Sequence, residues 1–146
     1  MVLLVVAKQL AELEHCNIDD GTMLHANGAG RAAIEDALTA LCGRPIRTDG
    51  VQFSGKTDPQ IMDEILRANR MEPVPTLVDD ALAVYEETAH AVFDPHDVDA
   101  LPGVAPLIDR LAAHPGAQLG LLTGNIESMA YRKIAAIDLD HHFAFG

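Results

Sequence analysis

The stretch that decides the fold class reads Gln118-Leu119-Gly120-Leu121-Leu122-Thr123-Gly124-Asn125. A short apolar run that ends in turn residues is typical of a buried strand. A helical pattern precedes it from residue 104 and stops at Pro115-Gly116, and a second helix is expected over residues 128–137. Helix, buried strand and helix in this order predict an α/β fold.

A second candidate strand lies at the start of the chain, where residues 2–6 read Val-Leu-Leu-Val-Val. An unbroken apolar run of this length is typical of a strand in a parallel sheet, which is covered on both faces. The alternative is one amphipathic helix over residues 1–15, because apolar side chains also recur there at helical spacing. We favour the strand, followed by a short helix, and expect it to form a small, incomplete parallel sheet with the strand that ends at Leu122.

Residues 27–94 are expected to form an inserted all-α block, and residues 1–26 and 95–146 the α/β core. Three helical patterns occur in the block, and Thr76 with Asp79 resembles a capping arrangement at the start of the third. The side chains expected to face the core are Ile34, Ala37, Leu38 and Leu41 in the first helix, Ile61, Met62, Ile65 and Leu66 in the second, Val78, Leu82, Tyr85, Ala89 and Val92 in the third, and Val104, Leu107, Ile108 and Leu111 in the helix after the block.

The composition limits the partners. The 146 residues carry 10 Lys and Arg against 22 Asp and Glu, a net charge of -12, which repels nucleic acid and anionic membranes. A phosphorylated substrate would therefore need a metal ion, a helix N-terminus or a few placed cations. Cys16 and Cys42 form no disulfide pattern, and the apolar start has no basic leader or cleavage site. These features predict a cytoplasmic protein with no membrane span.

The residues with the clearest chemical pattern are Asn17-Ile18-Asp19-Asp20-Gly21-Thr22. A phosphoryl-transfer site of this kind has two carboxylates one residue apart, in the order D-x-D-G-T, with the first as nucleophile and the second as general acid and base. Asp20-Gly21-Thr22 fits the second half. Two positions before Asp20 stands Ile18, and the other register, which starts from Asn17, places an amide where the nucleophile belongs.

Several ordered elements together resemble the haloacid dehalogenase superfamily, in particular its phosphoglycolate-phosphatase-like branch with a helical cap. Asp20-Gly21-Thr22 resembles the first motif, the all-α block resembles the cap, and Gly55-Lys56-Thr57-Asp58 is similar to a G-x-T-D segment of such caps. Leu101-Pro102-Gly103-Val104 resembles the helix that re-enters the core, and Leu121-Leu122-Thr123-Gly124-Asn125 resembles the second motif. The resemblance covers residues 17–146.

The resemblance implies hydrolysis of phosphate monoesters through an aspartyl-phosphate intermediate, with Mg²⁺ as cofactor and a small phosphorylated metabolite as substrate. By motif position, Asp20 would be the acid and base and a metal ligand, and Asp19 the other catalytic candidate. The phosphoryl group would be bound by Thr123, Gly124 and Asn125, with Thr22 beside them. Thr57 would contact the substrate from the cap.

We expect weak or absent phosphatase activity from this chain, because Ile18 or Asn17 occupies the nucleophile position and no third or fourth motif precedes Gly146. The alternatives are a catalytically silent protein that binds a phosphometabolite, and a truncated fragment. A fragment would leave a sheet edge unpaired, through which we expect self-association.

Overall fold

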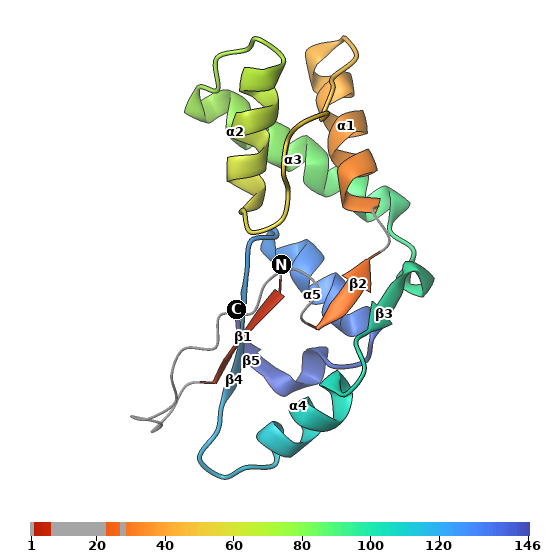
Figure 1. Ribbon diagram of the computed structural model, residues 1–146, viewed down its shortest axis with the longest axis vertical. Helices are drawn as coiled ribbons and strands as arrows, with labels where there is room; N and C mark the ends of the chain where they lie inside the picture. Colours follow the sequence, from red (N-terminus) through yellow and green to blue (C-terminus); the bar gives the residue numbers. More distant parts are fainter. Residues whose placement is uncertain (1, 7–22, 27–28) are drawn as a thin grey trace. The chain divides into compact units, whose positions relative to one another are not determined.

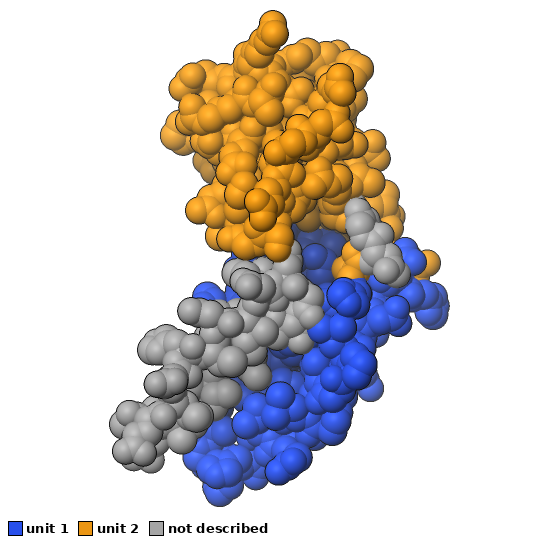
Figure 2. All heavy atoms as spheres, in the orientation of Figure 1, with its two compact units in different colours: residues 1–25, 95–146 blue, residues 26–94 orange. Residues whose placement is uncertain are grey.

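The computed structural model describes residues 2–6, 23–26 and 29–146 (Figure 1). The chain divides into two compact units (Figure 2). Unit 1 consists of Met1–His25 and Pro95–Gly146, and unit 2 of Ala26–Asp94. Unit 1 combines strands and helices, whereas the three long helices α1, α2 and α3 belong to unit 2.

Three strands of unit 1 form one sheet in the order β1-β4-β5. They are β1 (Val2–Val6), β4 (Leu119–Thr123) and β5 (Phe143–Phe145). The predicted strands at both places are confirmed, and so is the α/β class. Strand β5 runs parallel to β4, but β1 runs antiparallel to it, with Val2 opposite Thr123 and Val6 opposite Leu119.

The parallel direction that we expected for the first strand is therefore wrong, and the sheet is mixed. An unbroken apolar run indicates that both faces of a strand are covered. It carries no information on direction, because parallel and antiparallel neighbours satisfy the same backbone groups with different hydrogen-bond patterns.

A second, two-stranded sheet joins β2 (Leu24–Ala26) to β3 (Val98–Ala100), which follows a 3-10 turn at Pro95–Asp97. Next to it, the Leu101 backbone N-H donates to the Met23 carbonyl oxygen at 2.8 Å. The sequence did not predict this sheet, because strands of three residues are too short to show a period of two.

The core of unit 1 lies between the β4-β5 part of the sheet and its helices, α4 (Val104–Ala112) and α5 (Glu127–Ala136), with a 3-10 turn at Asp140–His142. One cluster of buried side chains joins these elements. Its members are Met23, Val104, Ile108, Leu119, Leu121, Ile134, Leu139 and Phe143. Leu107, which we expected on the buried face of α4, is 53% exposed. The buried face of α4 is therefore narrower than the apolar pattern of the sequence predicts.

Unit 2 consists of α1 (Ala29–Cys42), α2 (Asp58–Ala68) and α3 (Pro75–Val92). Helix α1 packs extensively against α3, and α2 packs against α3 as well. The predicted core positions of α2 are all buried: Ile61, Met62, Ile65 and Leu66. In α1, Ile34, Ala37 and Leu38 are buried, and Leu41 is half-buried.

Helix α3 differs from the prediction in two respects. Its buried stripe is Ala81, Tyr85 and Ala89, and Val92, which we expected in the core, is 54% exposed. Small alanine side chains allow a neighbouring helix to approach closely. Close packing between helices therefore buries the alanines and leaves the larger Val92 at the surface. The helix begins at Pro75 with Val74 as its N-cap, and no side chain caps it, so the predicted start at Thr76 is wrong. Proline suits the first helical position because its φ is already helical.

No helix within the described ranges is both long enough and apolar enough to cross a lipid bilayer.

Candidate active site

The turn after β4 carries the predicted phosphate-binding residues of unit 1. Thr123 is the last residue of β4, Gly124 is buried, and helix α5 begins at Glu127. The Asn125 backbone N-H donates to the Thr123 hydroxyl oxygen at 3.1 Å. This bond fixes the threonine hydroxyl beside the start of the helix.

Helix α5 presents its N-terminus at the same turn. Its N-cap residue, Ile126, has an apolar side chain that makes no capping hydrogen bond. The first N-H groups of a helix have no partner within the helix and carry partial positive charge, which suits an anion. In the first turn of α5, the Ser128 hydroxyl is buried and has no hydrogen-bond partner among the described residues.

Lys133 supplies a positive charge next to this turn. Its Nζ donates to the Asn125 side-chain oxygen at 2.5 Å, from a position eight residues further along the chain. Side chains on a helix lean toward its N-terminus, so a long side chain on the second turn of α5 can reach back to the turn after β4. Asn125 thus links a cation on one side to the Thr123 hydroxyl on the other.

Sequence reasoning missed Lys133. We expected no third-motif lysine or arginine before Gly146, whereas Lys133 lies on the helix that follows the Thr-Gly-Asn turn. The predicted helix over residues 128–137 could have indicated this contact, because a long side chain at Lys133 can reach back over about two helical turns to Asn125.

The predicted catalytic residues Asp19 and Asp20 and the predicted phosphate contact Thr22 lie outside the described residues. The structure therefore does not test their predicted roles. Asp20 was also the predicted metal ligand. Within residues 2–6, 23–26 and 29–146, no three or more His, Cys, Asp and Glu side chains gather to hold a metal ion. The described residues alone do not fit a Mg²⁺ site.

Thr57 belongs to unit 2 and is the N-cap of α2. Its hydroxyl accepts the Gln60 backbone N-H at 3.4 Å, and the Gln60 side-chain oxygen accepts the Thr57 N-H at 2.9 Å. This capping box explains why the helix begins here. Gly55 has a φ of +78°, which favours glycine in the turn before the cap.

The next residue, Asp58, is only 3% exposed. Burial, together with the negative charge of Asp58, raises the pKa of the Tyr85 phenol well above its usual range. Thr57, unlike Asp58, is thus exposed to solvent.

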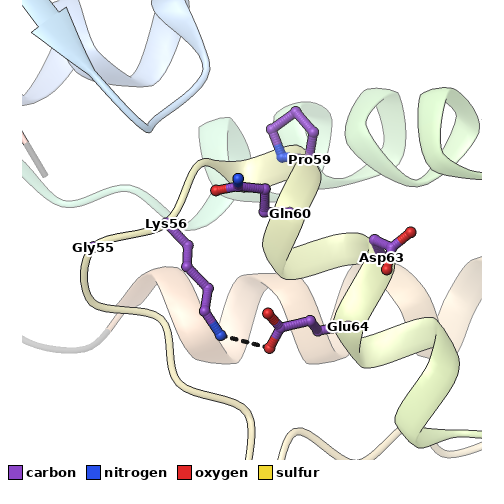
Figure 3. Close-up of a pocket in the computed structure, with 6 residues that line it drawn as sticks. All are labelled: Gly55, Lys56, Pro59, Gln60, Asp63 and Glu64. Carbon is purple, nitrogen blue, oxygen red and sulfur yellow. Dashed lines mark hydrogen bonds and ion pairs between the residues drawn. The ribbon is translucent and has the colours of Figure 1, made fainter.

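An open hollow of about 480 Å³ lies beside the start of α2 (Figure 3). Lys56, Gln60, Asp63 and Glu64 line it together with Gly55 and Pro59. The Lys56 ammonium points to Glu64 and lies 2.5 Å from its carboxylate oxygen. Asp63 pairs with Arg67 on the same helix at 2.7 Å. The charged groups of the hollow thus already have partners within unit 2.

The fold and the Thr123 turn together define an α/β protein with a Thr-Gly-Asn turn between a strand and a helix, a class in which ligands bind outside the carboxyl ends of strands. A sequence profile of one family, described as haloacid dehalogenase-like hydrolase, matches residues 20–145. The chain therefore belongs to the haloacid dehalogenase-like hydrolases. No curated protein sequence gives a significant match.

Proposed function

We propose that this chain binds small phosphate monoesters at the turn after β4 and belongs to the phosphatase branch of its family, with phosphoglycolate phosphatases as the branch that its motifs resemble. One observation supports this most strongly: Lys133, Asn125 and Thr123 form a hydrogen-bonded series at the N-terminus of α5. A hydroxyl, backbone N-H groups and an ammonium group are the donors that a phosphoryl group requires.

Each residue has a defined part in this proposal. Thr123 donates its hydroxyl to a phosphoryl oxygen, and the backbone at Gly124 and Asn125 supports it. Lys133 offsets negative charge in a protein whose net charge is -12. Asp20 protonates the leaving oxygen and then takes a proton from water. Thr57 contacts the leaving group, and Thr22 assists at the phosphoryl group.

The family generally uses Mg²⁺; in this proposal Asp20 would hold the ion, which would supply positive charge next to the phosphate. Asp19 is the remaining carboxylate of the motif. Neither Asn17 nor Ile18 can form an aspartyl-phosphate, so we propose that turnover is weak in the chain as written. Loss of one such group costs about 3 to 5 kcal/mol of transition-state stabilisation.

The first experiment measures binding. Inorganic phosphate is titrated calorimetrically into the wild-type chain, Thr123→Ala and Thr123→Ser. We expect binding to wild type and Thr123→Ser, and at least about tenfold weaker binding to Thr123→Ala, because a hydrogen bond to a charged group contributes about 1.5 to 3 kcal/mol. Equal affinities of the alanine and wild-type chains would remove the Thr123 turn as the binding site.

The second experiment measures turnover of p-nitrophenyl phosphate with Mg²⁺. Asn17→Asp and Ile18→Asp each restore a carboxylate in one register of the motif. We expect little release of phosphate by wild type and an increase for one of the two variants, which identifies the register. Turnover by wild type above a few per second, within the normal range of enzymes, would contradict the proposed weakness.

A catalytically silent protein that binds a phosphometabolite is the second candidate function, and the residues at positions 17 and 18 favour it. In that case phosphate binds at Thr123, but neither aspartate variant gains turnover. We propose a cytoplasmic location for either function, since Cys42 is a free thiol.

A further inference from the structure

The connection between α1 and α2 in unit 2 is held by one arginine. The Arg31 guanidinium donates from Nη1 to the Thr48 carbonyl oxygen at 3.1 Å and to the Thr48 hydroxyl at 2.9 Å. Its Nη2 donates to the Val51 carbonyl oxygen at 3.2 Å. A single side chain from the first turns of α1 thus ties down two points of residues 48–51.

The same guanidinium group lies 3.9 Å from the centre of the Phe53 ring, in a cation-π contact. Thr48, only 2% exposed, completes the arrangement by donating its hydroxyl to the Glu35 carboxylate, one turn further along α1. A planar group with several donors can make all these contacts at once, which a lysine ammonium cannot.

Asn69 anchors the preceding part of the same connection. Its side-chain nitrogen donates to the Arg47 carbonyl oxygen at 2.8 Å, and its side-chain oxygen accepts the Arg47 backbone N-H at 3.1 Å. Beyond Phe53, the chain turns through Gly55 and reaches Thr57, the N-cap of α2. The segment that leads to Thr57 therefore begins at Phe53, which Arg31 contacts.

We propose that Arg31 is a positioning residue for Thr57: by fixing residues 48–53 on α1, it sets the approach of the chain to the α2 N-cap and keeps the Thr57 hydroxyl ready for the leaving group of a phosphate ester. This inference rests on the proposed function, in which Thr57 contacts that group. A loop that is ordered before binding avoids the entropy cost of ordering it on the ligand.

Two backbone bonds report directly on the loop. The Val51 N-H donates to the Thr48 carbonyl oxygen at 3.0 Å, and the Lys56 N-H donates to the Phe53 carbonyl oxygen at 3.3 Å. Amide hydrogen exchange is measured for wild type, Arg31→Met, Arg31→Lys and Thr48→Val. Arg67→Met is the matched control, because Arg67 is an exposed arginine of the same unit that pairs with Asp63 on its own helix.

We expect Arg31→Met to accelerate exchange at Val51 and Lys56 by about tenfold or more, the effect of losing charge-assisted hydrogen bonds. Arg31→Lys should give a smaller acceleration, and the control none. Thr48→Val keeps the shape of the side chain and removes the hydroxyl that accepts from Arg31 and donates to Glu35, so it tests the same loop if Arg31→Met does not fold. Unchanged exchange at both amides in Arg31→Lys and Thr48→Val would overturn the proposal.

The ligand measurements compare p-nitrophenyl phosphate with inorganic phosphate. We expect Arg31→Met and Arg31→Lys to weaken binding of the ester and to leave inorganic phosphate unchanged, because only the ester has a leaving group. Faster exchange with unchanged affinity for the ester would overturn the positioning role. Absence of phosphate binding by wild type would instead refute the proposed function, while the exchange data still decide whether Arg31 holds the loop.

Discussion

The charge of Lys133 gives the most direct prediction about the proposed phosphate site. Lys133→Met removes the ammonium group that contacts the Asn125 side-chain oxygen, and keeps a side chain of similar length and helix propensity. Lys133→Arg keeps the charge. The methionine variant should bind inorganic phosphate more weakly, and the arginine variant should resemble wild type.

The size of the effect follows from the geometry of the turn. Lys133 Nζ lies 2.5 Å from the Asn125 oxygen, and the Asn125 backbone N-H lies 3.1 Å from the Thr123 hydroxyl oxygen, so a phosphate at Thr123 is close to the ammonium group. At an effective dielectric constant of about 20 and a separation of about 8 Å, one pair of unit charges contributes about 2 kcal/mol. Affinity should therefore fall about 30-fold in the methionine variant.

Calorimetric titration at low and moderate salt measures the loss. Arg110→Met is the control, because Arg110 is an exposed residue of α4 in the same unit and its removal changes the net charge equally. The loss for Lys133→Met should shrink as salt is added, since salt screens the charge. An affinity equal to that of Arg110→Met at low salt would refute the assigned role of Lys133.

Two further predictions concern unit 2. Burial raises the pKa of Tyr85, so its phenol stays protonated in the folded chain at pH values where the unfolded chain loses the proton. The contribution of this group to stability is complete below pH about 10, the pKa of tyrosine in the unfolded chain, and is lost as the pH rises toward the pKa in the folded chain. Urea unfolding at increasing pH should show a steeper loss for wild type than for Tyr85→Phe, and parallel curves would contradict the raised pKa. Thr57→Ala removes the capping box of α2 and should lower the free energy of unfolding by about 1 kcal/mol, whereas Thr57→Ser should retain most of it. Equal urea midpoints for the alanine and serine variants would mean that the cap contributes nothing.

Local patterns predicted the helices well because each carries its own signals. Gly43, with a φ of +63°, follows the last residue of α1, and the capping box at Thr57 marks the start of α2, although we predicted a capping arrangement only at Thr76. These signals act within one or two turns of a helix, so they can be read without knowledge of the rest of the chain. The turn at Thr123 belongs to the same category, since an apolar strand and the following helix define it.

The cation of the site could not be predicted in the same way. Lys133 is one of several basic residues in the sequence, and its role depends on a contact across two turns of α5 with Asn125. Arg31 is similar: its contacts with Thr48 and Val51 span 17 and 20 residues. Such contacts depend on how side chains are placed by elements that are already folded.

The sequence by itself determined where helices and buried strands form, because hydrophobic periodicity, caps and turn residues act over short distances. Only the tertiary structure decided the antiparallel direction of β1, the pairing of β2 with β3, and the burial of Ala81 in place of Val92 on α3. These features join segments far apart in the chain. Their energies come from packing and hydrogen bonds between elements, which the local pattern of either partner does not contain.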